Sequence, residues 1–197
     1  MDQKKAMSWF IIIIMILSGV GYVLVDSGEE ETIKKYNDFK FIRLQNGWRA
    51  NINSEKIVFN YIPQQVEDLQ ITPLEKKNDA IALLQNTPIL AVSYDPQSRY
   101  AQDLGALQYY LEQTLKGKTR YVQIGLTNNT KYPQLPQITC ANASQKLPVI
   151  ILDANTQLNN TQINYNNSCI TALASKIQDA YKITDRLIYI ILKVMNQ

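Results

Sequence analysis

Two aspartates follow segments that read as buried strands, and they are the residues that could most directly do chemistry. Asp95 closes the segment SYD and Asp153 closes the segment IILD. Ligands of open α/β sheets bind beyond the carboxyl ends of the strands. Two carboxylates on neighbouring parallel strands would there hold a cation or act as an acid–base pair. Asp is equally favoured in turns and at helix starts, and we prefer this structural interpretation for both residues.

The sequence excludes most histidine-dependent chemistry, because its 197 residues include no histidine. Ser-His-Asp triads, Cys-His pairs, HExxH zinc sites and His-ligated haem all need that side chain. The motifs GxxxxGKS/T, GxGxxG, GxSxG and SxxK are also missing from the sequence. We therefore expect no cofactor and no metal, and we lean toward a protein that is not an enzyme.

The two cysteines of the chain, Cys140 and Cys169, flank a stretch of 28 residues. A lone pair of cysteines in an exported protein is typical of a disulfide, which we predict here. The alternative is two buried free thiols. A zinc site needs more ligands than two cysteines without histidine supply.

Four Asn-x-Ser/Thr sequons fall within about forty residues, which makes N-glycosylation a reasonable expectation in a host that carries it out. Their acceptor asparagines are Asn128, Asn142, Asn159 and Asn166.

Residues 6–25 form a charge-free stretch whose length as a helix, roughly 30 Å, matches the hydrocarbon core of a bilayer. Lys4 and Lys5 precede it and acidic residues follow it, so the positive-inside rule places the N-terminus in the cytoplasm. We predict a single-pass signal anchor over residues 1–25. A cleavable signal peptide is the alternative, although no clear A-x-A cleavage site follows the apolar stretch.

The rest of the chain is expected to be a polar linker over residues 26–38 and an extracytoplasmic domain over residues 39–197. The bilayer is then a partner through residues 6–25, and an envelope protein or a glycan is a further possible partner. We expect no nucleic-acid partner, because the 20 basic and 17 acidic residues are dispersed and form no dense Lys/Arg block.

Apolar spacing indicates an α+β or α/β domain: a β-meander, a βαβ unit and a long C-terminal helix packed on a mixed sheet. The meander is predicted at 39–45, 48–52 and 56–62, and a short helix at 74–85. The βαβ unit is predicted from a strand at 89–94, a helix at 98–116 and a strand at 121–126. A strand at 147–152, a hairpin at 162–165 and 169–171, and a helix at 172–195 complete the expected elements.

The end of this last helix, residues 187–195 (LIYIILKVM), is apolar nearly all round. Nine residues are too few to span a membrane. We favour burial between the sheet and its neighbours. The alternative is a contact with a partner subunit or with the bilayer surface, as in a subunit of a larger membrane complex.

Several segments together carry a resemblance that covers most of the chain: YNDFKF, GWRANI and IVFNYIP near the N-terminus, the cysteine-containing ITCANAS, PVIIL and NNSCI, and the terminal ITDRLIYIIL. With the N-terminal apolar stretch, they resemble a group of small, uncharacterised archaeal membrane-anchored proteins. The resemblance implies an anchor and an exported domain with one cysteine pair, and it implies no activity. We expect a non-catalytic binding or scaffolding component of the cell envelope; the alternative is a carboxylate-dependent envelope hydrolase using Asp95 and Asp153.

Overall fold

The computed structural model describes residues 32–116, 120–157 and 159–195. The predicted anchor over residues 1–25 and most of the predicted linker lie outside these residues. Within the described part of the chain, none of the helices combines the length and the apolar character that a membrane crossing requires. The elements from Lys34 onward belong to one compact unit.

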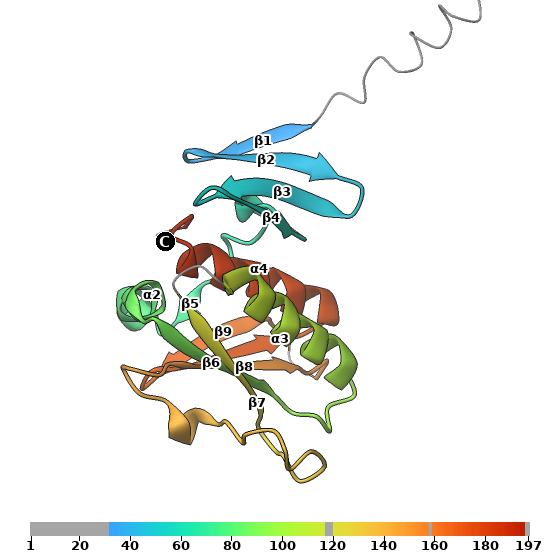
Figure 1. Cartoon of the computed structure of the whole chain (residues 1–197), viewed down its shortest axis with the longest axis vertical. Coiled ribbons are helices and arrows are strands. Elements are labelled where there is room, and N and C mark those ends of the chain that lie inside the picture. Colours follow the sequence, from blue (N-terminus) through green and yellow to red (C-terminus); the bar gives the residue numbers. More distant parts are fainter. Residues whose placement is uncertain (1–31, 117–119, 158, 196–197) are drawn as a thin grey trace, which may run out of the picture. The chain divides into compact units, whose positions relative to one another are not determined.

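The first sheet is a four-stranded meander in the order β1-β2-β3-β4 (Figure 1). It consists of β1 (Ile33–Tyr36), β2 (Phe39–Leu44), β3 (Gly47–Ile52) and β4 (Glu55–Phe59). Gly47 has a φ of 137°, and a Cβ there would lie 2.4 Å from the carbonyl oxygen of Phe59, so the turn before β3 requires glycine. The three predicted strands are confirmed to within a few residues, whereas β1 lies in the segment that we predicted to be linker.

The second sheet is mixed and has six strands in the order β5-β9-β10-β8-β6-β7. Its strands are β5 (Ile71–Thr72), β6 (Ile89–Tyr94), β7 (Tyr121–Leu126), β8 (Val149–Ala154), β9 (Gln162–Asn166) and β10 (Cys169–Ala174). All its neighbouring pairs are parallel except β9 and β10, which form the predicted hairpin. β6 and β7 are parallel neighbours in the sheet, and a helix connects them in the chain. The predicted βαβ unit is therefore confirmed.

Three α-helices occur among the described residues: α2 (Lys77–Asn86), α3 (Ala101–Leu115) and α4 (Ile177–Ile191). The chain is therefore α+β with a mixed sheet. α3 begins three residues later than predicted, because the preceding residues form a turn. The backbone N–H of Gln97 donates to the Asp95 carboxylate at 2.8 Å, and that of Ser98 donates to the Asp95 carbonyl at 3.1 Å.

The predicted start of the last helix at residue 172 is wrong, because Cys169–Ala174 is strand β10 and the helix begins at Ile177. β10 lies between β9 and β8, and its alternate residues Ile170, Ala172 and Ala174 are buried in the main core. Alanine has a high helix propensity and a low strand propensity. Pairing with a strand on both sides outweighs that local preference.

α4 lies between the two sheets, which explains why the end of the helix, from Leu187 onward, is apolar nearly all round (Figure 1). On the meander side, the ring of Tyr189 lies 4.5 Å from the ring of Phe59 and 5.9 Å from that of Phe41, between centroids. On the other side, α4 packs against β10 and β8. Residues 187–195 are buried apart from the exposed Lys193, so the surface that motivated a partner contact through this segment is not exposed.

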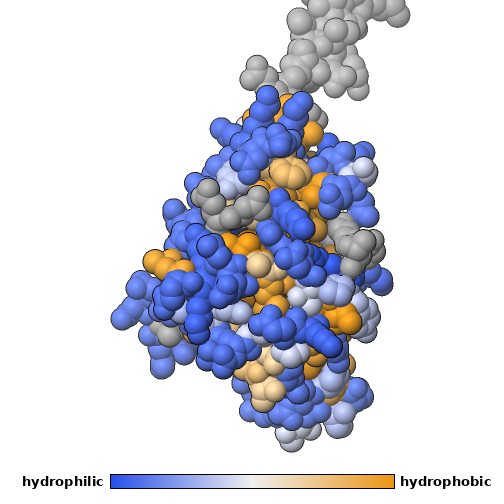
Figure 2. Space-filling view, turned by 90° about the vertical axis from the view of Figure 1, so that its left-hand side faces the viewer, coloured by the Kyte–Doolittle hydropathy of each residue, from blue (hydrophilic) through white to orange (hydrophobic). Residues whose placement is uncertain are grey.

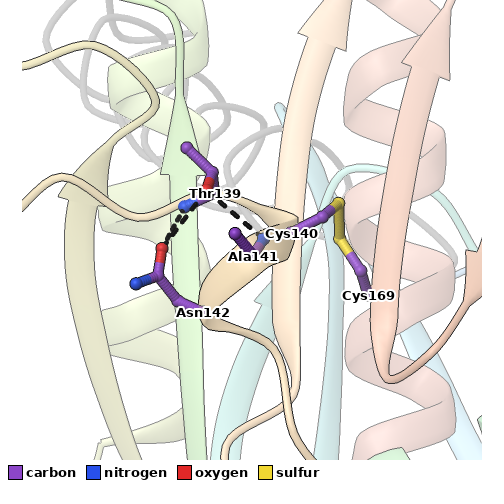
Figure 3. Close-up of a disulfide and its surroundings, with 5 residues drawn as sticks. All are labelled: Thr139, Cys140, Ala141, Asn142 and Cys169. Carbon is purple, nitrogen blue, oxygen red and sulfur yellow. Dashed lines mark hydrogen bonds between the residues drawn. A yellow bond between two sulfur atoms is a disulfide. The ribbon is translucent and has the colours of Figure 1, made fainter.

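The segment between β7 and β8 packs on the face of the mixed sheet that is turned away from the main core. Its Ile138 forms a small second core with Ala91, Val149 and Cys169. A Cβ on Gly125 would lie 2.5 Å from the Ile138 side chain, so the segment packs directly on the glycine backbone. The predicted disulfide is present: Cys140 is bonded to Cys169, with the two Cα atoms 5.3 Å apart (Figure 3).

Candidate binding groove

An open groove of about 770 Å³ lies where α2 meets the amino end of β6. This volume is in the range of small-molecule and cofactor pockets. One wall is α2, from Asp79 to Asn86, together with the residues that lead into β6; the other is the turn before β8, and Tyr165 of β9 also contributes. The lining residues are Asp79, Ala82, Leu83, Asn86, Thr87, Pro88, Ile89, Gln145, Lys146 and Tyr165.

The α2 wall is fixed by hydrogen bonds at the end of the helix. The Thr87 hydroxyl is buried and donates to the carbonyl of Leu83 at 2.7 Å. The guanidinium of Arg120 donates to the carbonyls of Leu84, Gln85 and Thr87. The last carbonyls of a helix lack partners within the helix. A cation near them also interacts favourably with the negative end of the helix dipole. Partial burial lowers the pKa of Arg120 from its usual value.

The opposite wall is a tight turn that belongs to the disulfide-linked segment. Ser144 and Leu147 exchange two backbone hydrogen bonds of 3.0 and 3.1 Å, and these bonds place Gln145 and Lys146 at the tip. Cys140 lies four residues before Ser144 and is covalently held to the start of β10. The disulfide therefore limits how far this wall can move from the sheet.

The lining combines an apolar surface with a few polar groups. Leu83, Pro88 and Ile89 supply apolar area, and the Ile89 side chain is 40% exposed although it belongs to a central strand. Asp79 and Lys146 add one charge of each sign, and Asn86 and Gln145 add amides. Figure 2 shows the side of the molecule on which α2 lies, where apolar patches reach the surface among hydrophilic ones. This combination suits binding of a ligand with an apolar body and polar ends.

The two aspartates singled out by the sequence occupy corresponding positions at one edge of the mixed sheet. Tyr94 pairs with Leu152 in the parallel register of β6 and β8, so Asp95 follows β6 one step beyond this pair, in line with Asp153. Asp95 is exposed and its carboxylate accepts the turn hydrogen bond from Gln97. Asp153 is half-buried, on the face of β8 opposite its core residues Leu152 and Ala154. Among the described residues, no group of three or more acidic or cysteine side chains could hold a metal ion.

A carboxylate that sequence reasoning missed lies in the interior. Asp185 on α4 is fully buried, and its Oδ2 accepts backbone hydrogen bonds from Asn60 at 2.9 Å and Tyr61 at 2.8 Å. Its Oδ1 lies 2.7 Å from the hydroxyl of Tyr110, which also lies 3.1 Å from the carbonyl of Val58. Asp185 thus joins α4 to α3 and to the chain that leaves the meander.

This arrangement accommodates either protonation state of Asp185. When Asp185 is ionised, the Tyr110 hydroxyl donates to it; when Asp185 is protonated, Oδ1 donates to Tyr110, whose proton then turns to the Val58 carbonyl. Burial raises the pKa of Asp185 to about 7, although the hydrogen bonds from Tyr110, Tyr61 and Asn60 act in the opposite direction. Burial and the neighbouring carboxylate likewise raise the pKa of Tyr110. We interpret this cluster as a structural junction, since Asp185 is not among the residues that line the groove.

The four predicted glycosylation sites lie on loops and turns around the mixed sheet or at a strand end. Asn142, Asn159 and Asn166 are exposed and Asn128 is half-buried. The hydrogen-bonding environments of their sequons differ.

Comparison of the chain with protein-family models, with curated proteins and with solved structures finds no match. The function must therefore be argued from the groove and its surroundings. The similarity to archaeal membrane-anchored proteins stays a prediction from the sequence.

Proposed function

We propose that this chain is a membrane-anchored, extracytoplasmic binding domain whose groove between α2 and the amino end of β6 holds an extended apolar segment of an envelope protein. The groove itself carries the proposal. It has the volume of a ligand site, an apolar floor and opposite charges at Asp79 and Lys146. A polypeptide segment offers matching features, because it combines apolar side chains with backbone polar groups and charged ends.

A glycan is a less suitable occupant of this groove. Sugar rings stack on exposed aromatic faces, whereas Tyr165, the aromatic residue of the lining, is buried. Catalysis has little support at this site, because the Thr87 hydroxyl is committed to the Leu83 carbonyl.

The location outside the cytoplasm is supported by the charge-free stretch at residues 6–25 and by the Cys140–Cys169 disulfide, since disulfides persist in oxidising compartments. The test is the intact mass of the membrane-extracted protein, with thiol labelling before and after reduction. We expect the full-length mass and labelling of both cysteines only after reduction. A mass that begins near Tyr22 would indicate cleavage and secretion, and thiols free before reduction would contradict export.

The groove is tested with a synthetic library of twelve-residue peptides in which a central apolar residue is varied. Binding to the full-length protein in detergent micelles is measured by fluorescence polarisation. We expect peptides with a large central apolar side chain to bind, and Ile89→Asp to weaken their binding by about tenfold or more, because a carboxylate replaces apolar contact area.

Ile124→Asp is the matched control. Ile124 is an exposed isoleucine, at 36%, on the neighbouring parallel strand β7, and it does not line the groove. We expect this variant to bind peptides like the unmodified protein. Failure of the whole library to bind, or an equal loss in both variants, would contradict the proposal.

A carboxylate-dependent envelope hydrolase is the second candidate, favoured by the parallel register that aligns Asp95 with Asp153. Carboxyl pairs of glycoside hydrolases are separated by roughly 5–9 Å. The candidate predicts turnover of an envelope glycan or peptide that is lost in both Asp95→Asn and Asp153→Asn. Turnover that persists in both variants would eliminate this pair as the catalytic residues.

A further inference from the structure

The four sequons differ in the state of the hydroxyl group at their third position. An N-glycosylating enzyme must reach both the asparagine amide and this hydroxyl, because both define the sequon. The third residues are Thr130, Ser144, Thr161 and Ser168. Thr130 and Ser144 are exposed, whereas Thr161 is half-buried and Ser168 is buried.

Asn128 already forms a compact turn with the hydroxyl of its own sequon. Its Oδ1 accepts a hydrogen bond from the backbone N–H of Thr130 at 3.0 Å and another from the Thr130 hydroxyl at 2.6 Å. Thr130 is exposed. Both bonds use the amide oxygen, so neither of them involves the Nδ2 nitrogen, which is the atom that would be glycosylated.

Asn142 has a similar arrangement beside the disulfide. Its Oδ1 accepts from the backbone N–H of Thr139 at 2.8 Å and from the Thr139 hydroxyl at 3.3 Å. In Figure 3 the nitrogen of the Asn142 amide points away from these bonds and from the Cys140–Cys169 disulfide. Asn142 and Ser144 are both exposed, so the amide and the sequon hydroxyl lie at the surface together.

The other two sequons have exposed asparagines, but the hydroxyl of one is held in hydrogen bonds and that of the other is buried. The Thr161 hydroxyl donates to the Asp179 carboxylate at 3.0 Å and accepts from the backbone N–H of Ser175 at 3.1 Å. Ser168 belongs to the turn between β9 and β10 and is 3% exposed. An enzyme can reach either hydroxyl only after the hairpin opens locally.

We propose that the folded chain is N-glycosylated at Asn128 and Asn142 and not at Asn159 or Asn166. This inference rests on the proposed export of the domain. In the reaction a bond forms between Nδ2 and the first sugar carbon, and the bond from that carbon to the diphosphate of a lipid-linked donor breaks. Nδ2 loses one proton and the lipid diphosphate leaves.

The test uses a purified oligosaccharyltransferase and a lipid-diphosphate-linked oligosaccharide in a cell-free reaction. Its substrates are the oxidised full-length protein in detergent micelles and, separately, peptides obtained by digesting that protein. Modified sites are identified by peptide mass spectrometry. We expect all four sequons to react in the digest, and reaction at Asn159 and Asn166 to be slower in the intact chain by about tenfold or more.

Gln157→Thr supplies a positive control on the same side of the sheet as Asn159. Asn155 is exposed and its Oδ1 accepts from the backbone N–H of Gln157 at 3.0 Å, which repeats the Asn128 turn without a sequon hydroxyl. The substitution completes a sequon there, so we expect the intact variant to be modified at Asn155 as well.

The inference is overturned if the intact chain reacts at Asn159 or Asn166 as fast as the digest does. It is also overturned if Asn128 or Asn142 stays unmodified in the intact chain or in the digest. Because the reaction is cell-free, neither result bears on membrane anchoring or on peptide binding, which are measured separately.

Discussion

The hydroxyl of Tyr110 on α3 lies 2.7 Å from the Asp185 carboxylate on α4, and this contact joins the two helices beneath the meander. The same carboxylate accepts two backbone hydrogen bonds from the chain that leaves β4. One buried side chain thus connects three parts of the fold. All stability and binding measurements described here use the full-length protein in detergent micelles.

Removing the Asp185 carboxylate should lower the free energy of unfolding more than removing the Tyr110 hydroxyl. In Asp185→Ala, two backbone N–H groups and the Tyr110 hydroxyl lose a buried acceptor, and we expect the free energy of unfolding to fall by about 3 kcal/mol. Tyr110→Phe removes one bond and should cost about 1 kcal/mol. Urea denaturation followed by circular dichroism measures both. Tyr109→Phe is the control. Tyr109 is 63% exposed, so this substitution should leave the free energy of unfolding almost unchanged.

Stability should depend on pH through Asp185. Burial raises its pKa from 3.8 to about 7, so the folded state binds this proton more tightly than the unfolded state. The resulting stabilisation is complete below about pH 4, decreases as the pH rises from 4 to 7, and is lost above pH 7. Denaturation midpoints measured across this range should show the decrease, and Asp185→Asn should flatten it. A midpoint that rises over the same range in the unmodified protein would contradict the assignment.

Reduction of the disulfide should lower both the free energy of unfolding and the affinity of the groove for peptides. Cys140 and Cys169 are 29 residues apart, and a cross-link closing a loop of this size stabilises a protein by roughly 3–4 kcal/mol. The groove wall at Gln145 and Lys146 belongs to the same segment, so peptide affinity should also fall. A Cys140→Ser, Cys169→Ser double variant should reproduce both effects, which denaturation and fluorescence polarisation detect. Unchanged peptide affinity would show that the wall is held without the disulfide.

Ser93→Ala should stabilise the protein. The Ser93 hydroxyl on β6 is fully buried and has no hydrogen-bond partner among the described residues. Replacing the hydroxymethyl side chain with the methyl group of alanine removes an unsatisfied polar atom, which should raise the free energy of unfolding by about 1 kcal/mol or more. Thr87→Val makes the opposite comparison, because the buried Thr87 hydroxyl donates to the Leu83 carbonyl and its loss should destabilise. Thermal unfolding of the two variants should therefore shift in opposite directions.

The elements that the sequence predicts best are those with clear local boundaries. The strands at 89–94 and 121–126 agree with the structure, because each is a short apolar run between turn-forming residues. The start of α4 was wrong because the alanines of β10 favour helix locally, whereas pairing with β8 and β9 depends on residues far away in the chain. The sequence of a strand does not identify the strands that pair with it.

The candidate groove could not have been predicted, because its walls come from α2, from the turn at 144–147 and from β9. Asp185 carries one signal in the sequence that points to its special environment. It stands with Arg186 inside the apolar segment ITDRLIYIIL, where a charged pair is unusual unless it has partners. Its partners, Asn60 and Tyr110, lie 125 and 75 residues away, and no local pattern identifies them.

The position of α4 between the two sheets also sets an order of events during biosynthesis. Asn60 is made 125 residues before Asp185, its hydrogen-bonding partner, so the meander emerges long before the helix that buries its inner face. Until then Phe41 and Phe59 have no Tyr189 to pack against. Nascent chains that expose such apolar strands are prone to aggregation. The growing chain is therefore most exposed to premature association in the interval before the residues of α4 have followed.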